Sequence, residues 1–261
     1  MAQNPRHDNI LRIISRLRQV TVGELTERTG VSEVTIRKDL TLLEEMGYVV
    51  RSHGGAQLAE DLPVTRDIAA RRVEQVAEKE RIAEAAFRLI NDGDTIYLDS
   101  GSTCEALSRL LAPMSLRVVT NSIAVMNTLS SADGIALFSI GGSYRREAGS
   151  FLGPLAVENA SGFQIETCFI GATGISDRGV FSSQNILESQ LKAAVLRTSA
   201  RRVVLADTSK FKTSAFSVFA RVGDVDVVVV DHEFDGTERL RSLGIEVLVS
   251  SADPEKEEEK E

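Results

Sequence analysis

The sequence predicts an α/β protein of two domains, a small N-terminal domain and a larger domain built on a mainly parallel sheet. The chain has 261 residues, too many for one small domain and enough for a short module and a larger one. The first 56 residues show helical periodicity, and beyond residue 94 short apolar runs alternate with amphipathic stretches. Continuous apolar strands that alternate with helices are typical of a parallel sheet covered on both faces.

Two helices are predicted before residue 30. The first spans residues 9–18, because four apolar residues recur there at helical spacing: Ile10, Ile13, Ile14 and Leu17. The second follows Thr21, a suitable N-cap, and runs through Leu25 to about Arg28. It ends before Gly30, a residue that favours the left-handed conformation found after helices.

A third helix and a hairpin complete the small domain. Ser32 caps this helix, which ends at Gly47. One of its faces carries a stripe of three apolar residues: Ile36, Leu40 and Leu43. The run YVVRSHGGAQ that follows is rich in β-branched residues and contains a Gly-Gly turn. We therefore predict a helix-turn-helix with a hairpin wing over residues 1–56, followed by a linker at 57–66.

The outward face of the third helix carries side chains that suit DNA. If the apolar stripe faces the core, a rotation of about 100° per residue turns Val34, Lys38 and Thr41 outward. Basic side chains donate to guanine edges, and hydroxyls and helix N-termini bind phosphate oxygens. The candidate DNA-binding residues are Ser32, Thr35, Arg37, Lys38, Thr41, Arg51 and His53. A three-helix protein-interaction module fits the same spacing, so spacing alone leaves both interpretations open.

The larger domain is predicted over residues 67–251. A charged amphipathic helix at 68–90, with a break allowed near Glu78, precedes the sheet. The strand candidates are seven apolar runs at 95–99, 117–120, 135–140, 167–172, 202–207, 225–231 and 245–250. Amphipathic stretches at 103–111, 122–130, 185–200 and 236–243 separate several of them. The last segment, 252–261, is expected to be an acidic disordered tail.

Polar loops follow several of these strands. The first lies between a strand and a helix, where backbone N–H groups and hydroxyls suit an anion, and consists of Asp99, Ser100, Gly101, Ser102 and Thr103. Loops after the next two strands contain Thr120, Asn121 and Ser122, and then Gly141 and Gly142. Ligands in open α/β sheets bind at the carboxyl ends of strands, so we expect the three loops to converge. Helix capping is the alternative role of such small polar residues.

Charged residues complete the candidate ligand site. Lys210 suits a phosphate and Asp207 suits sugar hydroxyls, although a surface lysine paired with a nearby acid is the alternative. Arg145, Glu188 and Lys192 are weaker candidates, because an exposed position would explain each equally well. The two cysteines, Cys104 and Cys168, show no metal-ligand spacing. We therefore expect buried structural thiols, no metal and no cofactor.

The formal net charge of −8 does not exclude DNA as a ligand. Residues 1–60 contain eight Lys/Arg and eight Asp/Glu, whereas residues 252–261 carry a net charge of −4. The acidity therefore belongs to the body and tail, and a basic helix face remains free to contact DNA. No apolar run reaches the roughly 20 residues of a membrane span, and the N-terminus lacks a signal-peptide core, so we expect a cytoplasmic protein.

Residues 20–56 closely resemble the signature of the DeoR family of bacterial sugar-metabolism repressors. The pattern V-S-x-x-T-I-R-K-D-L, then L-E-x-x-G and R-x-H-G-G-A, occurs here without gaps. Six downstream segments resemble that family's effector domain in order: 78–86, 92–103, 118–122, 140–145, 169–175 and 205–211. The resemblance implies a winged helix-turn-helix joined to a fold similar to sugar-phosphate isomerases. It also implies a repressor whose binding to operator DNA is controlled by a phosphorylated sugar.

Two further expectations concern assembly and chemistry. One short helix contacts too few base pairs for genomic specificity, so we expect a homo-oligomer, either a dimer or a tetramer. The alternative function is a sugar-phosphate isomerase, which needs a general base. Ribose-phosphate isomerases carry a D-G-A-D-E stretch, whereas residues 171–175 here read Gly-Ala-Thr-Gly-Ile. Because these acids are missing, we expect a binding domain without catalytic residues rather than an enzyme.

Overall fold

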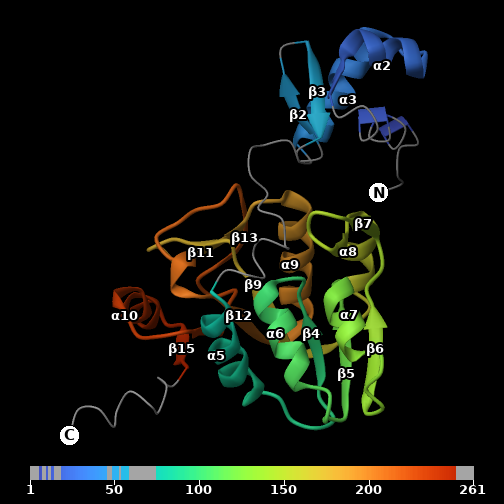
Figure 1. Cartoon of the computed structure of the whole chain (residues 1–261). Coiled ribbons are helices and arrows are strands. Elements are labelled where there is room, and N and C mark those ends of the chain that lie inside the picture. Colours follow the sequence, from blue (N-terminus) through green and yellow to red (C-terminus); the bar gives the residue numbers. More distant parts are fainter. Residues whose placement is uncertain are drawn as a thin grey trace, which may run out of the picture. The chain divides into compact units, whose positions relative to one another are not determined.

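The computed structural model describes residues 6–7, 10, 13–14, 19–45, 49–52, 54–58 and 75–250. The chain divides into two compact units, Met1–Thr65 and Arg66–Glu261. Figure 1 colours them along the sequence from blue to red. No helix in the described part of the chain is long and apolar enough to cross a membrane.

A seven-stranded sheet forms the centre of the larger unit (Figure 1). Its strands are β4 (Thr95–Leu98), β5 (Leu116–Thr120), β6 (Ile135–Ser139), β9 (Ile165–Gly171), β12 (Ser199–Leu205), β14 (Val227–Val230) and β15 (Glu246–Val249). Every neighbouring pair in this sheet is parallel. The seven predicted apolar runs all contribute strands, so the predicted α/β fold with a mainly parallel sheet is confirmed.

Helices cover both faces of this sheet. One face packs against α5 (Val76–Phe87), α6 (Ser102–Leu110) and α7 (Ile123–Leu129). The other packs against α8 (Pro154–Ala160), α9 (Ile186–Thr198) and α10 (Asp235–Ser242). Within β4, Tyr97 belongs to the core on the α9 side, whereas Ile96 and Leu98 belong to the core on the α6 side. This alternation follows from the two-residue period of a strand and explains why the strand sequences are apolar throughout.

Several elements of the larger unit were not predicted. They are α8, the hairpin of β7 (Ser143–Arg145) and β8 (Ser150–Leu152), the short 3-10 helix η2 (Thr208–Lys210), and a small sheet of β10 (Gly174–Ile175), β11 (Val180–Ser183) and β13 (Ser217–Arg221). The helix predicted at 68–90 is helical only over α5 among its described residues, and 68–74 lie outside the described part. The predicted tail 252–261 and residues 59–66 of the predicted linker also lie outside it.

The strand order changes direction between β4 and β9. The sheet runs β15-β14-β12-β9-β4-β5-β6, so the chain first builds outward from β4 to β6 and then returns to the opposite side of β4. Adjacent loops leave in opposite directions at such a point, which opens a crevice at the carboxyl ends of the two strands. Asp99 and Gly171 stand at this place, directly after β4 and at the end of β9.

The N-terminal unit combines helices with a three-stranded antiparallel sheet in the order β1-β3-β2. Its elements are β1 (Gln19–Thr21), α2 (Val22–Thr29), α3 (Glu33–Glu45), β2 (Val49–Ser52) and β3 (Gly55–Leu58). Residues 10, 13 and 14 of the predicted first helix are helical, as are residues 6 and 7, which precede its predicted start. This is the predicted arrangement of helices and hairpin, with β1 as an additional strand.

The ends of α2 lie at Thr21 and Gly30, the residues that the sequence predicted as its N-cap and its stop. The Thr21 hydroxyl accepts a hydrogen bond from the Glu24 N–H at 3.2 Å, and the Glu24 carboxylate accepts one from the Thr21 N–H at 2.8 Å. This reciprocal pair is a capping box. Gly30 ends the helix with φ +69° and donates its N–H to the Thr26 carbonyl at 2.9 Å. The turn between α2 and α3 therefore depends on a glycine.

Strand β3 extends into the segment that was predicted to be a linker. Gln57 and Leu58 belong to β3, so the prediction that the linker begins at residue 57 was wrong. The reason is tertiary, because β3 is the central strand and Gln57 opposes residues of both β1 and β2. A Cβ on Gly55 would lie 2.1 Å from the Val20 carbonyl oxygen, so the close approach of β1 requires glycine there.

A compact apolar core fixes the orientation of α3. The described side chains at the centre of this core are fully or almost fully buried: Ile10, Ile14, Leu25, Ile36, Leu40 and Leu43. The three members on α3 are the predicted stripe, so that prediction is confirmed. Because this stripe faces inward, the opposite side of α3 is presented to solvent.

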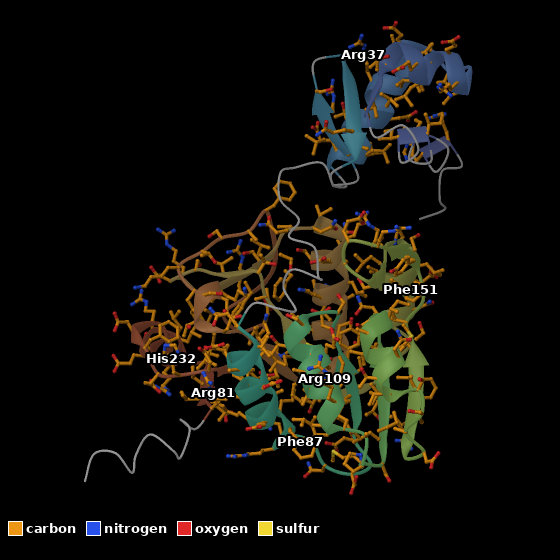
Figure 2. All side chains as sticks on the ribbon, viewed as in Figure 1. Arg37, Arg81, Phe87, Arg109, Phe151 and His232 are labelled. Carbon is orange, nitrogen blue, oxygen red and sulfur yellow. The ribbon has the colours of Figure 1, made fainter. Side chains whose placement is uncertain are left out.

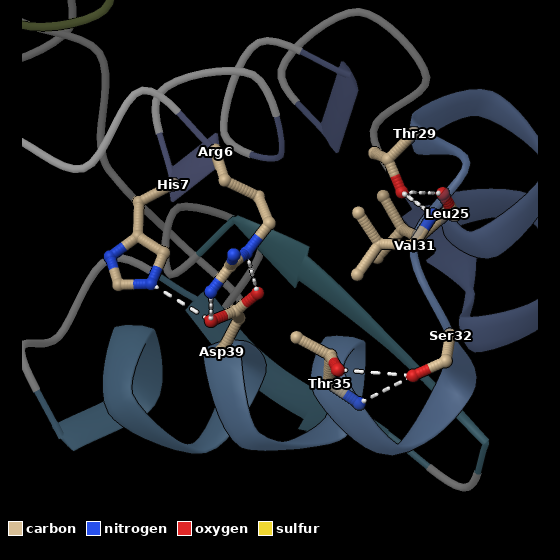
Figure 3. A network of polar contacts seen from close by, with 8 residues as sticks. All are labelled: Arg6, His7, Leu25, Thr29, Val31, Ser32, Thr35 and Asp39. Atoms are coloured by element: carbon tan, nitrogen blue, oxygen red, sulfur yellow. Dashed lines mark hydrogen bonds and ion pairs between the residues drawn. The ribbon is translucent and has the colours of Figure 1, made fainter.

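A buried carboxylate adds a polar constraint on the same helix. Asp39 lies on α3 and is 5% exposed. Arg6 donates two hydrogen bonds to it, from Nε at 2.6 Å and from Nη2 at 2.9 Å, and His7 Nε2 lies 3.0 Å from the same carboxylate (Figure 3). Burial alone would raise the pKa of Asp39, but the hydrogen bonds from Arg6 and His7 outweigh it and hold the pKa below its ordinary value. The cluster ties the N-terminal segment to α3.

Replacing Asp39 with Asn should destabilise the N-terminal unit in a pH-dependent way. A carboxylate whose folded pKa lies below its unfolded pKa stabilises the fold above the unfolded pKa, and this contribution is lost as the pH falls through the folded pKa. We expect the free energy of unfolding to fall by about 1–3 kcal/mol at neutral pH. The difference between the variant and wild type should become smaller below roughly pH 4. Thermal melts of the full-length wild type and Asp39→Asn between pH 3 and pH 7 measure this, with the exposed position Glu27→Gln as control. If the variant were destabilised equally at every pH, the ionised carboxylate of Asp39 would not be the source of the stabilisation.

Candidate nucleic-acid interface and ligand pocket

The outer face of α3 forms a shallow, open groove on the N-terminal unit. Five side chains line it: Val34, Arg37, Lys38, Thr41 and Leu42. Figure 2 labels Arg37, which lies on the surface of the unit. Three of the predicted DNA-binding residues, Arg37, Lys38 and Thr41, are thus brought together on the face that the apolar stripe leaves free.

The remaining predicted DNA-binding residues lie at the start of α3 and in the hairpin. The Ser32 and Thr35 hydroxyls are 3.0 Å apart, and the Thr35 N–H donates to the Ser32 hydroxyl at 3.4 Å (Figure 3). Arg51 on β2 donates from Nη1 to the Thr41 hydroxyl at 3.1 Å, which joins the hairpin to the groove. His53 lies outside the described residues. The geometry therefore unites one face of α3, its first turn and a residue of the hairpin close to its turn.

The larger unit has a polar pocket at the carboxyl ends of β4, β9 and β12. The loop 99–103 lines it, together with Asp207 and Lys210 from the predicted set. The lining also contains Lys79, Gly171, Ala172, Glu188, Lys192, Leu205 and Ala206. The cavity has a volume of ≈ 40 Å³, which is room for a few water molecules. Three lysines and three carboxylates thus meet at the point where the strand order reverses.

A buried ion pair lies in this pocket. Asp99 and Lys192 are 2% and 6% exposed, and Lys192 Nζ lies 3.3 Å from Asp99 Oδ2. Lys192 also donates to the Gly171 carbonyl at 2.7 Å and to the Ser183 hydroxyl at 3.0 Å. The Gly171 N–H donates to Asp99 Oδ2 at 3.2 Å. The pair therefore links the ends of β4 and β9 to α9, and Lys192, a weaker candidate in the sequence, is a principal residue of the site.

Side chains from the segment after β12 and from α9 also line the pocket. Lys210 Nζ lies 3.7 Å from Asp207 Oδ2, which matches the alternative interpretation of a lysine beside its acid, but both residues line the pocket. Asp207 also accepts a hydrogen bond from the Ser209 N–H at 3.0 Å. Glu188 is 8% exposed, and its carboxylate has no hydrogen-bond partner among the described residues. This carboxylate is therefore available to a ligand in the pocket.

Lys79 is a pocket residue that the sequence prediction missed. It lies on α5 and is 6% exposed, although it stands in a run of charged residues that is typical of a solvated helix face. The sequence assigns residues 78–86 to a charged amphipathic helix and to the family resemblance, but not to the ligand site. Its neighbours Ile82, Ala83 and Ala86 are buried, so a helical wheel anchored on those residues would have turned Lys79 inward.

The loops after β5 and β6 do not line this pocket, contrary to the expected convergence of three loops. Thr120 donates its hydroxyl to the Leu98 carbonyl at 2.6 Å, Asn121 accepts from the Tyr97 hydroxyl at 3.0 Å, and Ser122 caps α7. The physical reason is strand order: β5 and β6 lie on the other side of β4 from β9 and β12. Any role of these three residues in ligand binding stays a prediction.

Gly141, Gly142 and Arg145 also lie away from the pocket lining. Gly142 has φ +115°, and a Cβ there would lie 2.7 Å from the Leu152 carbonyl oxygen. This glycine is therefore required by the close approach of the chain around the β7–β8 hairpin. Arg145 pairs with Glu147 at 4.0 Å. Their predicted role in ligand binding is likewise untested.

The two cysteines are fully buried free thiols. Burial raises the pKa of Cys168 to about 11 and raises the pKa of Cys104 further. Both thiols are therefore protonated at neutral pH, in agreement with the structural role that was predicted. Within the described ranges, His, Cys, Asp and Glu form no group of three that suits a metal ion.

Comparison with known proteins identifies both units. Residues 6–61 match the DeoR-like helix-turn-helix domain, and residues 74–232 match the DeoR C terminal sensor domain. The chain belongs to the DeoR family. The transcriptional repressor AccR of Agrobacterium fabrum is 34% identical, over 88% of this chain and 92% of its own. The glycerol-3-phosphate regulon repressor of Escherichia coli is 33% identical, over the same shares of 88% and 92%.

Solved structures also resemble this DeoR-family chain. Ribose 5-phosphate isomerase A from Methanocaldococcus jannaschii is 20% identical with a TM-score of 0.38, over 51% of this chain and 53% of its own. The δ subunit of eIF2B from Chaetomium thermophilum is 17% identical with a TM-score of 0.46, over 60% and 56%.

Membership of the DeoR family decides the class of function. The chain is a DNA-binding transcriptional repressor and not an isomerase, because its family and its relatives are regulators. The helix-turn-helix match includes α2, α3 and the hairpin, and the sensor-domain match includes every residue that lines the pocket. The interaction-module and isomerase alternatives are thereby set aside.

The Asp99–Lys192 pair should stabilise the sensor domain. We expect Lys192→Met to lower the free energy of unfolding by about 3–5 kcal/mol, because it leaves the buried carboxylate of Asp99 without its cation. The double variant Asp99→Asn with Lys192→Met should recover a large part of this loss. Urea unfolding of the full chain measures both, and Lys210→Met is the matched control, because its side chain is a quarter exposed and 3.7 Å from its acid. If Lys192→Met and Lys210→Met lowered the free energy of unfolding equally, the buried Asp99–Lys192 pair would have no special stabilising role.

Proposed function

We propose that this repressor controls an operon of sugar metabolism and that a phosphorylated sugar, held in the pocket at the ends of β4, β9 and β12, controls its binding to operator DNA. The observation that carries the proposal is the gathering of the 99–103 loop with Lys79, Lys192 and Lys210. A relative named for a glycerol-3-phosphate regulon supports a phosphorylated effector.

On the DNA side, α3 enters the major groove as the second helix of the helix-turn-helix. Arg37 and Lys38 face the base edges, and the helix N-terminus with Ser32 and Thr35 binds phosphate oxygens. Arg51 and His53 of the hairpin contact the DNA backbone or minor groove. One α3 reads only a short half-site, so the protein binds as a dimer or a higher even oligomer on a site of matching symmetry.

On the effector side, the N-terminus of α6 holds the phosphate. Gly101 is the N-cap of this nine-residue helix and makes no side-chain cap bond, so the first amides of α6 are available to an anion. The hydroxyls of Ser100, Ser102 and Thr103 add donors, and Lys210 adds positive charge. Asp207 and Glu188 accept hydrogen bonds from the sugar hydroxyls.

The pocket changes shape when the effector binds. Its volume of ≈ 40 Å³ holds a few waters, and the proposal includes a rearrangement of its ion-paired side chains when the larger sugar phosphate binds. Lys79 connects this change to α5, the first described element after the segment that joins the two units in sequence. A ligand alters operator affinity only if it binds two arrangements unequally, and the coupling must be reciprocal.

The effector class is tested by a thermal-shift screen of phosphorylated sugars and their unphosphorylated counterparts with the full-length protein. A ligand that binds the folded state raises the melting temperature. The proposal expects shifts from one or a few sugar phosphates and none from the free sugars. A screen in which free sugars stabilise the protein equally would show that the phosphate is not recognised.

Replacing Arg37 with Ala should weaken operator binding. If Arg37 reads a base, the loss is about 1–3 kcal/mol and the preference at one position relaxes. If it contacts a phosphate, affinity falls similarly for every sequence. The slope of the logarithm of the binding constant against the logarithm of salt concentration then decreases in size by about one. Gel-shift titrations of the full chain against the promoter region beside its own gene, at several salt concentrations, measure both quantities. If Arg37→Ala kept the wild-type affinity and salt dependence, α3 would not be part of the DNA interface.

Replacing Ser102 with Asp should abolish the effector response and spare the fold. The new carboxylate occupies the phosphate position, and a like charge there should weaken ligand binding by about tenfold or more. An acid in the first turn of a helix is itself stabilising, so α6 remains intact. Operator affinity with and without the ligand from the screen is measured for wild type, Ser102→Asp and the neutral control Ser102→Asn. If Ser102→Asp kept the full ligand response, the phosphate would not bind at the 99–103 loop.

A further inference from the structure

The groove on α3 contains an apolar side chain that the folding of the unit does not need. Val34 is 66% exposed, more than any other large hydrophobic residue in the described part of the chain. It stands in the first turn of α3, where a β-branched residue is a weaker helix former than alanine or the charged residues around it. Single exposed apolar residues are common on protein surfaces, so exposure alone does not assign a role.

The surroundings of Val34 make its position informative. It shares the groove with Arg37, Lys38 and Thr41, one and two turns further along the same face. Its orientation is fixed, because Ile36, Leu40 and Leu43 on the opposite side of α3 are buried. In a helix-turn-helix the N-terminal residues of the second helix are those that contact base edges. Val34 therefore stands where a base edge would be met, with cations on the adjacent turn.

The apolar group that B-DNA displays in its major groove is the 5-methyl of thymine. The other edges present hydrogen-bond donors and acceptors, which valine cannot satisfy and whose desolvation is unfavourable. We propose that Val34 packs against a thymine 5-methyl group in each half-site of the operator and thereby selects thymine at that position. The proposal rests on α3 being the helix that enters the major groove.

The test isolates one methyl group. The full-length protein first selects its preferred duplexes from a random library at fixed salt. Deoxyuridine then replaces thymidine in the selected duplex, one position at a time in both half-sites, which removes only the methyl. We expect one position at which this change weakens wild-type binding about fourfold per half-site. Val34→Ala should bind the two duplexes equally at that position, and Val34→Ile should keep the wild-type ratio.

Two controls make the outcome decisive. Leu42→Ala alters the other exposed apolar residue of the groove, two turns away and 45% exposed, and should keep the wild-type ratio of thymidine to deoxyuridine binding. Thermal melts of each variant check the fold. If Arg37→Ala weakens binding but Val34→Ala keeps the wild-type ratio, or if no thymine is selected, the thymine contact is overturned. If Arg37→Ala and Val34→Ala both bind as wild type does, α3 is not the reading helix and the proposed interface fails with it.

Discussion

The sensor domain depends on the ion pair between Asp99 and Lys192 at the reversal of strand order. Two charges that are almost fully excluded from water need each other and further hydrogen bonds to remain there. Lys192 supplies these by reaching the Gly171 carbonyl and the Ser183 hydroxyl, and the Gly171 N–H completes the set on Asp99. The ends of β4 and β9 and the start of the 99–103 loop are therefore held by one polar cluster.

The same cluster borders the proposed effector site. Lys192 and Lys210 already have the carboxylate partners Asp99 and Asp207, so the proposed phosphate at the N-terminus of α6 would compete with these two acids for the lysines. The structure shows the arrangement in which these ion pairs are formed internally, and the proposed effector would favour a second one in which the lysines pair with the ligand. Two arrangements with unequal ligand affinity are the physical requirement for coupling to DNA binding.

The N-terminal unit uses a related constraint for a different purpose. Asp39 is buried on α3 and held by Arg6 and His7, which lie far from it in sequence (Figure 3). Together with the apolar stripe, this cluster fixes the rotation of α3, so the outer side chains keep a defined direction. A rigid helix that presents two basic residues, a hydroxyl and an exposed valine is suited to reading DNA, because recognition requires side chains that are already in place.

Local features of the sequence determined most of the fold. The cap at Thr21, the stop at Gly30 and the stripe on α3 depend on interactions within a few residues, and the apolar runs of the parallel sheet need only burial on both faces. The loop 99–103 is likewise a local pattern, a strand followed by small polar residues and a helix. These patterns are visible without knowing which elements are neighbours.

The composition of the site was decided by tertiary structure. Strand order places the ends of β9 and β12 on one side of β4 and those of β5 and β6 on the other. Thr120 and Gly142 therefore lie outside the pocket lining, whereas Lys79 and Lys192 belong to it. Residues 57–58 form part of a strand because Gln57 pairs with both β1 and β2 and Leu58 pairs with β2. Periodicity along one chain tells which way a side chain faces on its own element. Which side chains meet depends on how distant elements pair, and the sequence by itself does not record that order.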